Sequence, residues 1–202
     1  MKDHNFMKLG RLMFGFGFSA IGIEYAIKAQ IGLGPWDILN QGLASRLHLS
    51  YGLASILISM LIVAVMLIGG VKVGWGTILN ITVTSILIDL IARLNIIPYA
   101  QNFQQGIIMS LISMIFTAFG SYYYLSCQLG FGPRDGLMCL LVTKLKISIS
   151  FARIGSEGIA FLIGWLIGGP AGLGSLIFVI GSGPIMKWVF DAYNFKVQSI
   201  SN

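Results

Sequence analysis

The stretch LASILISMLIVAVMLIGG at residues 53–70 decides the fold class of this chain. None of its 18 residues is charged. A helix needs roughly 20 mostly apolar residues to cross a hydrocarbon core about 30 Å thick. Residues 53–70 therefore predict a transmembrane helix rather than a buried helix of a soluble protein.

The composition of the whole chain agrees with this prediction. Of its 202 residues, 56% are hydrophobic and 10% are charged, whereas soluble proteins carry roughly 25% charged residues. The 13 Lys and Arg residues give a net charge of +6, but they are scattered between apolar runs. Such scattering is typical of positive-inside topology signals and not of a nucleic-acid interface. The composition excludes a soluble enzyme or a soluble binding domain.

Further apolar stretches predict an all-α polytopic membrane helix bundle that lies in contact with the lipid bilayer. The six candidate spans are residues 12–30, 53–70, 77–96, 107–127, 150–168 and 173–190. The first follows a basic tail, as in a signal peptide, but Glu24 and Lys28 stand where a cleavage site would be needed. We therefore expect it to be a retained span.

Two shorter segments, residues 35–48 and 133–146, lie between these spans. Each has 14 residues and would be only about 21 Å long as a helix. Each begins with Pro after Gly, which is a helix-start signal. We expect half-helices, which a membrane tolerates only where the broken backbone is buried in protein or lines a cavity.

The motif before the first short segment occurs twice. Residues 32–37, GLGPWD, recur as residues 130–135, GFGPRD, at an offset of 130 − 32 = 98. The same offset aligns Phe18 with Phe116, Gly22 with Gly120, Tyr25 with Tyr123, Gln30 with Gln128, Gly74 with Gly172 and Gly76 with Gly174. The sequence therefore predicts one membrane domain, residues 1–202, made of two homologous halves at residues 11–98 and 107–194.

The relative orientation of the halves stays open from the sequence. If the short segments do not span, each half has three spans and the halves are inverted; if they do, each has four and the halves are parallel. The positive-inside rule leaves three of the 13 Lys and Arg residues outside in either arrangement, so it does not discriminate. We expect about six spans plus two half-helices, with eight spans as the alternative.

The doubled motif also carries a family resemblance. Together with residues 38–43, 49–52, 136–138, 153–157 and 172–175, it resembles the YczE/YyaS/YitT group of bacterial membrane proteins, and YczE most within that group. The resemblance covers essentially the whole chain. It implies a multi-pass protein of the bacterial cytoplasmic membrane with a repeated fold, and it names no substrate or reaction.

Asp37 and Asp135 are the first candidates for function, because each lies in the first turn of a predicted short helix. In the structural interpretation, the carboxylate stabilises the positive end of its own helix. In the functional interpretation, two helix starts converge on a polar cavity and bind a ligand or ion. Arg134 replaces Trp36 between the halves, and either neutralises Asp135 or binds an anionic group of the substrate.

The predicted sites include these residues and others around them. The expected substrate-binding residues are Asp37, Asp135, Arg134, Trp36, Gly34, Gly132, Gln30 and Gln128. Glu24, Glu157 and Arg153 are the expected proton or ion relay, because ionisable groups are costly inside a membrane. Spacing of four residues makes ion pairs the plainer account for Arg153 with Glu157 and for Glu24 with Lys28.

These features favour a secondary transporter or permease for a small solute, with a non-transporting scaffold or modulator of another membrane component as the alternative. The sequence holds no catalytic motif, so we expect no enzyme, no cofactor and no metal site. A homodimer is compatible with the small size of the chain. Arg134 weakly favours an anionic or zwitterionic solute.

Overall fold

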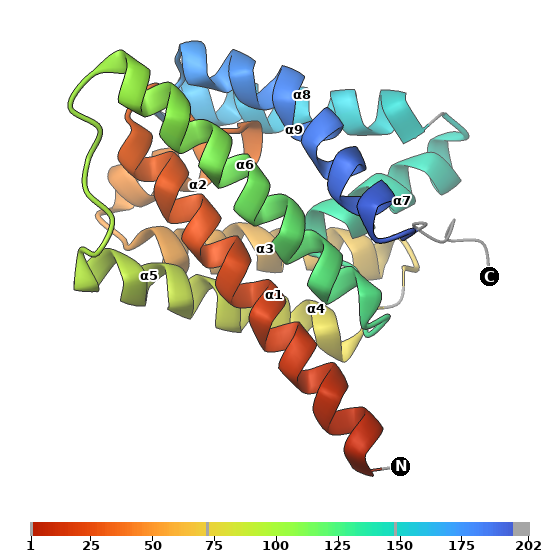
Figure 1. Ribbon diagram of the computed structural model, residues 1–202. Coiled ribbons are helices and arrows are strands. Elements are labelled where there is room, and N and C mark those ends of the chain that lie inside the picture. The colour runs from red at the N-terminus through yellow and green to blue at the C-terminus, as the bar shows by residue number, and fades with distance from the viewer. Residues whose placement is uncertain (1, 72, 148, 196–202) are drawn as a thin grey trace.

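The structure, a computed structural model, describes residues 2–71, 73–147 and 149–195, and every regular element in that part of the chain is helical. Figure 1 shows the helices packed side by side as a bundle. The helices are α1 (Lys2–Ala29), α2 (Pro35–Leu47), α3 (Tyr51–Ile68), α4 (Trp75–Leu79), the π-helix η1 (Asn80–Thr84), α5 (Ser85–Leu94), α6 (Phe103–Ser126), α7 (Pro133–Leu145), α8 (Ile149–Leu166) and α9 (Leu173–Ala192). The predicted all-α bundle is confirmed.

Five of the described helices are long and apolar enough to cross a membrane. They lie at Lys8–Ala29, Tyr51–Ile68, Trp75–Leu94, Phe103–Ser126 and Leu173–Ala192. Helix α8 occupies the position of the remaining predicted span, and its segment Ile154–Leu166 is a shorter apolar helix. The chain is thus a multi-pass membrane protein in contact with lipid.

The two short helices have the bounds that their prolines predict. Each has 13 residues, starts at a proline, and ends before a residue in the left-handed conformation, His48 at φ 53° and Lys146 at φ 54°. At 1.5 Å per residue each is about 20 Å long, which is too short to cross a hydrocarbon core of about 30 Å. Gly34 and Gly132, the residues before the two helices, are buried, so both helices begin inside the bundle.

Helices α1 and α6 pack closely and antiparallel, as α1 in red and α6 in green show in Figure 1. A Cβ on Gly22 would lie 2.7 Å from Thr117, and a Cβ on Gly120 would lie 2.8 Å from the Ser19 nitrogen. Small residues let membrane helices approach this closely. The offset of 98 equates Gly22 with Gly120 and Ser19 with Thr117, so the two contacts are reciprocal.

The loop before each short helix hydrogen-bonds to a helix start in the other predicted half of the chain. The Gly174 amide at the start of α9 donates to the Ile31 carbonyl oxygen at 2.7 Å. In the other half, the Gly76 amide at the start of α4 donates to the Leu129 carbonyl oxygen at 2.8 Å. Each half therefore completes the backbone hydrogen bonding of the other half's loop, which matters because lipid offers no partner.

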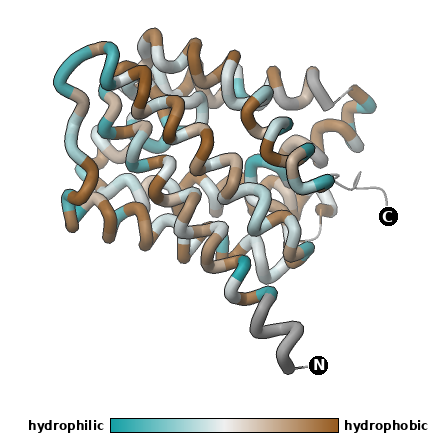
Figure 2. The backbone as a smooth tube through the Cα atoms, viewed as in Figure 1, coloured by the Kyte–Doolittle hydropathy of each residue, from teal (hydrophilic) through white to brown (hydrophobic). Residues whose placement is uncertain are grey.

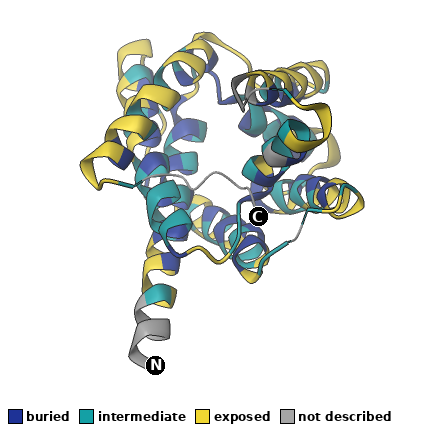
Figure 3. Ribbon diagram, turned by 90° about the vertical axis from the view of Figure 1, so that its right-hand side faces the viewer, coloured by how far each residue is buried: buried dark blue, intermediate teal, exposed yellow. Residues whose placement is uncertain are grey.

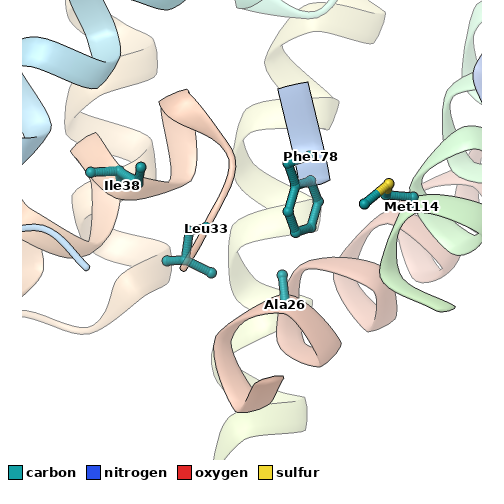
Figure 4. Close-up of a cluster of buried hydrophobic side chains, with 5 residues drawn as sticks. All are labelled: Ala26, Leu33, Ile38, Met114 and Phe178. Carbon is teal, nitrogen blue, oxygen red and sulfur yellow. The ribbon is translucent and has the colours of Figure 1, made fainter. Parts of the chain in front are cut away.

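Apolar packing holds the helices together around these contacts. Ala26 of α1, Leu33, Ile38 of α2, Met114 of α6 and Phe178 of α9 form one buried cluster (Figure 4). Exposed residues lie mainly on the outer faces of the helices (Figure 3), and many of them are the apolar segments shown in brown in Figure 2. An apolar outer surface is what a bilayer requires of a membrane protein.

Candidate functional site

A cavity of about 270 Å³ lies between the starts of the two short helices. Both halves contribute to its wall, through helices α1, α2, α3, η1 and α5 and through α6, α7, α8 and α9. The charged side chains in its wall are Asp37, Arg134, Asp135 and Glu157. A cavity with these charged groups in its wall is the kind of space that the functional interpretation of the doubled motif requires.

Asp37 is a buried carboxylate with two donors from other helices. The Tyr51 hydroxyl of α3 donates to Asp37 Oδ1 at 2.8 Å, and Asn40 Nδ2 donates to that hydroxyl at 3.2 Å. Arg134 Nη2 of α7 donates to the same Asp37 oxygen at 2.7 Å. These carboxylate bonds go to side chains and not to the free amides of α2, so the bonding is more than helix capping.

Arg134 joins the two halves across the cavity. Its partner Asp37 is 97 positions away, and its guanidinium carbon lies 5.8 Å from the centre of the Trp36 ring. The Arg134 side chain is 42% exposed, whereas that of Asp37 is 11% exposed. Arg134 therefore neutralises the aspartate of the opposite motif while part of its guanidinium still faces open space.

Asp135 has a different environment from Asp37. The Tyr124 hydroxyl of α6 donates to Asp135 Oδ2 at 2.7 Å. The neighbouring cation, Arg134, pairs with Asp37 and not with Asp135. Asp135 therefore has a neutral donor but no cation in contact within the described part of the chain.

Hydroxyl groups line much of the remaining wall. On α6 they recur every four residues, at Ser113, Thr117 and Ser121, so they share one helical face. The Ser113 and Thr84 oxygens are buried and have no hydrogen-bond partner among the described residues. Thr84 ends the π-helix η1, a helical irregularity frequent at functional sites.

The structure brings together most of the predicted substrate-binding residues. Those on the cavity wall are Gly34, Trp36, Asp37, Gly132, Arg134 and Asp135. Gln30 and Gln128 are exposed, adopt left-handed conformations at φ 54° and 55°, and lie outside the described cavity wall. Their predicted role in binding finds no contact here and stays a prediction.

Of the predicted relay residues, the structure places Glu157 and Glu24 apart. Glu157 lies on the cavity wall, and the side chain of Arg153 lies outside the described residues. Glu24 is away from the wall, in a buried pair with Lys28 at 3.8 Å. Lys28 Nζ also donates to Asn95 Oδ1 at 3.1 Å, so Glu24 belongs to a polar cluster that ties α1 to the end of α5.

Asp89 has a structural role at the start of α3. Its carboxylate accepts hydrogen bonds from the Ser50 hydroxyl at 2.5 Å and from the Gly52 amide at 2.8 Å. Ser50 is the N-cap of α3, because its hydroxyl oxygen accepts from the Leu53 amide, and Asp89 of α5 adds a carboxylate at this positive helix end. This contact holds α3, and with it Tyr51, against the bundle.

Sequence reasoning missed Tyr51, Tyr124 and the hydroxyl lining. A tyrosine in an apolar helix carries no local signal of the carboxylate that it will meet. The four-residue spacing of the α6 hydroxyls was readable and would have marked a polar helical face. Within residues 2–71, 73–147 and 149–195, no three His, Cys, Asp or Glu side chains are placed to hold a metal ion.

Comparison of the sequence with known proteins finds relatives in bacteria, one of them described as a membrane protein. A family model described as "Family of unknown function (DUF6198)" matches residues 6–191. An uncharacterized protein of Haemophilus influenzae is 32% identical over 180 residues, which cover 89% of this chain and 82% of that protein. The uncharacterized membrane protein YczE of Bacillus subtilis is 30% identical over 173 residues, which cover 84% of this chain and 79% of YczE.

YyaS of the same Bacillus is 25% identical over 181 residues, which cover 87% of this chain and 89% of YyaS. The resemblance to the YczE/YyaS group is confirmed, although these identities separate YczE from YyaS only weakly. No solved structure matches the chain.

Proposed function

We propose, from the premise that this chain belongs to the DUF6198 family, that it is a secondary transporter or permease for a small solute in the bacterial cytoplasmic membrane. The observation that carries the proposal is the polar cavity built by both short-helix starts, with Arg134 bonded to Asp37 across it. Transporters bind substrates where discontinuous helices from two repeats meet. The activity is transport without a chemical reaction.

The antiparallel packing of α1 and α6 supports inverted halves. Helices that are equivalent in two repeats and run antiparallel are related by an axis across their length, and such an axis lies in the membrane plane. Phe18 stacks on its equivalent Phe116, with ring centres 5.3 Å apart, as residues next to such an axis would. Inverted halves allow the same site to open to either side in turn.

Alternating access assigns a role to the contact between Arg134 and Asp37. In this mechanism one half rocks against the other around the bound solute. The pair ties α7 to α2, so its bond must break or shift when the cavity opens on that side. A charged contact between moving elements can do this reversibly, because partly exposed ion pairs contribute little net stability.

The first test is accessibility of the cavity. Ser59→Cys and Ser121→Cys each place one small thiol on the wall, in a variant whose Cys127 and Cys139 are replaced by serine. An impermeant thiol reagent is applied to intact cells and to inverted vesicles. We expect both thiols to react from both sides, because the cavity opens alternately.

Ser45→Cys, on the exposed end of α2, is the control and should react from one side only. A cavity thiol that reacts from one side under every condition would refute alternating access. That result would favour the alternative of a non-transporting modulator of another membrane component.

A second test addresses the orientation of the halves. Arg46 and Lys144 are exposed, lie near the ends of α2 and α7, and are 98 positions apart. Cysteines at these positions should react from opposite sides of the membrane if the halves are inverted, and from one side if they are parallel. The homodimer stays a prediction, which the mass of the purified protein in detergent tests.

A further inference from the structure

We infer that Asp135 is the counter-ion for a positively charged group, so that the solute taken by the cavity is a small organic cation bearing an ammonium or guanidinium group. The inference rests on the proposed function only for the movement of that solute. Binding itself is a separate property of the site.

The charges on the cavity wall carry the inference. Among the described residues at the two short-helix starts there are two carboxylates, Asp37 and Asp135, and one guanidinium, Arg134. Arg134 is bonded to Asp37 at 2.7 Å, and this pair is neutral as a unit. Asp135 is half-buried within the bundle of a membrane protein, where an ionised carboxylate is costly unless a cation compensates it. A cationic solute would supply that compensation to Asp135.

The hydrogen bonding around Asp135 leaves room for a ligand. The Tyr124 hydroxyl donates to Oδ2, and no described side chain is recorded as a donor to Oδ1. Tyr124 therefore holds the carboxylate in position without neutralising it. The second oxygen is the natural acceptor for an N–H group of a bound solute.

Unpartnered hydroxyls provide a second, independent sign of a ligand. Ser113 is fully buried and Thr84 is 8% exposed; both line the cavity, and their oxygens have no partner among the described residues. Buried polar groups are normally hydrogen-bonded, so these two hydroxyls, shielded within the wall, leave unused hydrogen-bonding capacity beside the cavity. A cavity of about 270 Å³ limits that ligand to a small molecule.

The structure also weakens the case for an anionic solute. From the sequence, Arg134 favours an anion because its guanidinium is an excellent carboxylate partner. That partner is already present as Asp37. An anion would have to displace Asp37 and would then leave that buried carboxylate without its cation.

The test measures binding with small probes of defined charge. The purified full-length chain in detergent is heated with ethylammonium, ethylguanidinium, acetate or glycine at equal ionic strength. We expect each cation to raise the unfolding temperature by roughly 3–5 °C at about ten times its dissociation constant. Acetate should have no effect, and glycine should have less effect than ethylammonium.

Substitutions locate the charge that is responsible. Asp135→Asn should abolish the shift caused by the cations, and Asp135→Glu should retain part of it. Asp191→Asn, the same change at an exposed position of α9 away from the cavity wall, is the matched control and should keep the full shift. If Asp135→Asn does not fold, the comparison of probes on the unmodified chain still decides the sign of the charge.

Three results would overturn the inference. These are a larger shift with acetate or glycine than with ethylammonium, an unchanged cation shift in Asp135→Asn, and no shift with either cation. Cation binding without two-sided thiol labelling would refute the transporter and leave the charge assignment standing. Two-sided labelling without cation binding would do the reverse.

Discussion

Asp37 and Asp135 stand at the same place in two matching motifs, yet their surroundings differ. Asp37 is bonded to Tyr51 of the following helix α3 and to Arg134 of the opposite half. Asp135 is bonded to Tyr124 of the preceding helix α6. One site is therefore neutralised within the protein, and the other keeps a charge for a partner.

The backbone around these two residues is alike where the side chains are not. Positive φ angles recur 98 positions apart, at Gln30 and Gln128 and again at Gly32 and Gly130. Equivalent backbone positions thus keep the same conformation in both predicted halves, whereas the side chains around the two aspartates differ and give them different environments. Substitutions at equivalent positions should therefore change stability equally where backbone contacts are repeated, and should have unequal effects at the cavity.

The largest expected effect is at the two glycines that contact the loops before the short helices, Gly74 against the loop before α7 and Gly172 against the loop before α2. A Cβ on Gly74 would clash with the Leu129 carbonyl oxygen, and a Cβ on Gly172 would clash with the Ile31 carbonyl oxygen. Gly74→Ala and Gly172→Ala should each destabilise the protein by about 2–3 kcal/mol, measured as the free energy of unfolding in detergent. Gly17→Ala, with nothing within 4 Å of its added carbon, is the control. Clearly different losses of unfolding free energy in Gly74→Ala and Gly172→Ala would contradict the expected equivalence of the two positions.

A smaller effect is expected at the pair that joins the halves. Arg134→Ala leaves the Asp37 carboxylate buried without its cation and should cost about 2 kcal/mol of unfolding free energy. This is below the roughly 3–5 kcal/mol typical of fully buried pairs, because Arg134 is 42% exposed. Adding Asp37→Asn should recover part of the loss, as a double-mutant cycle would show. Strict additivity of the two changes would argue against a functional pair.

Removal of the two tyrosine hydroxyls sharpens the comparison at the carboxylates. Tyr51→Phe and Tyr124→Phe should each cost about 1–2 kcal/mol of unfolding free energy, because each removes a hydrogen bond to a carboxylate. Only Tyr124→Phe should also weaken the binding of ethylammonium, by roughly tenfold for about 1.4 kcal/mol. Equal loss of binding in both variants would mean that the two carboxylates act alike.

The smallest effect is expected at the glutamines before the motifs. Gln30→Gly and Gln128→Gly relieve left-handed backbone strain at exposed positions and should each change the unfolding free energy by less than about 1 kcal/mol. Binding of ethylammonium should be unchanged in both. A marked loss of binding in either variant would restore the predicted role of these glutamines in the substrate site.

The helices were predictable because their signals are local. Apolar length predicts the long spans, as residues 53–70 do, and a proline after a glycine predicts the starts of α2 and α7 at Pro35 and Pro133. Family membership was likewise predictable from the doubled motif. The internal repeat stays a prediction, although its equivalent positions share contacts and backbone conformations.

The partners of the candidate site were not predictable in the same way. Both aspartates were singled out because their motif occurs twice, but their donors lie on other helices, and Arg134 is 97 positions from Asp37. Only tertiary packing brings such groups within 3 Å. From the sequence, Arg134 was therefore expected to neutralise Asp135 or to bind a substrate anion, because nothing local shows that its partner is Asp37.

The hydrogen bond between the loop before α2 and the start of α9 has a consequence for folding during synthesis. The ribosome releases the amino-terminal half first. The Ile31 carbonyl oxygen has no Gly174 amide to bond until a further 174 − 31 = 143 residues have been synthesised. A nascent chain that stops short of α9 thus holds an unfinished loop inside the bilayer, which exposes it to the proteases that clear incomplete membrane proteins. Insertion of α9 is therefore the step that completes the hydrogen bonding of the loop before α2.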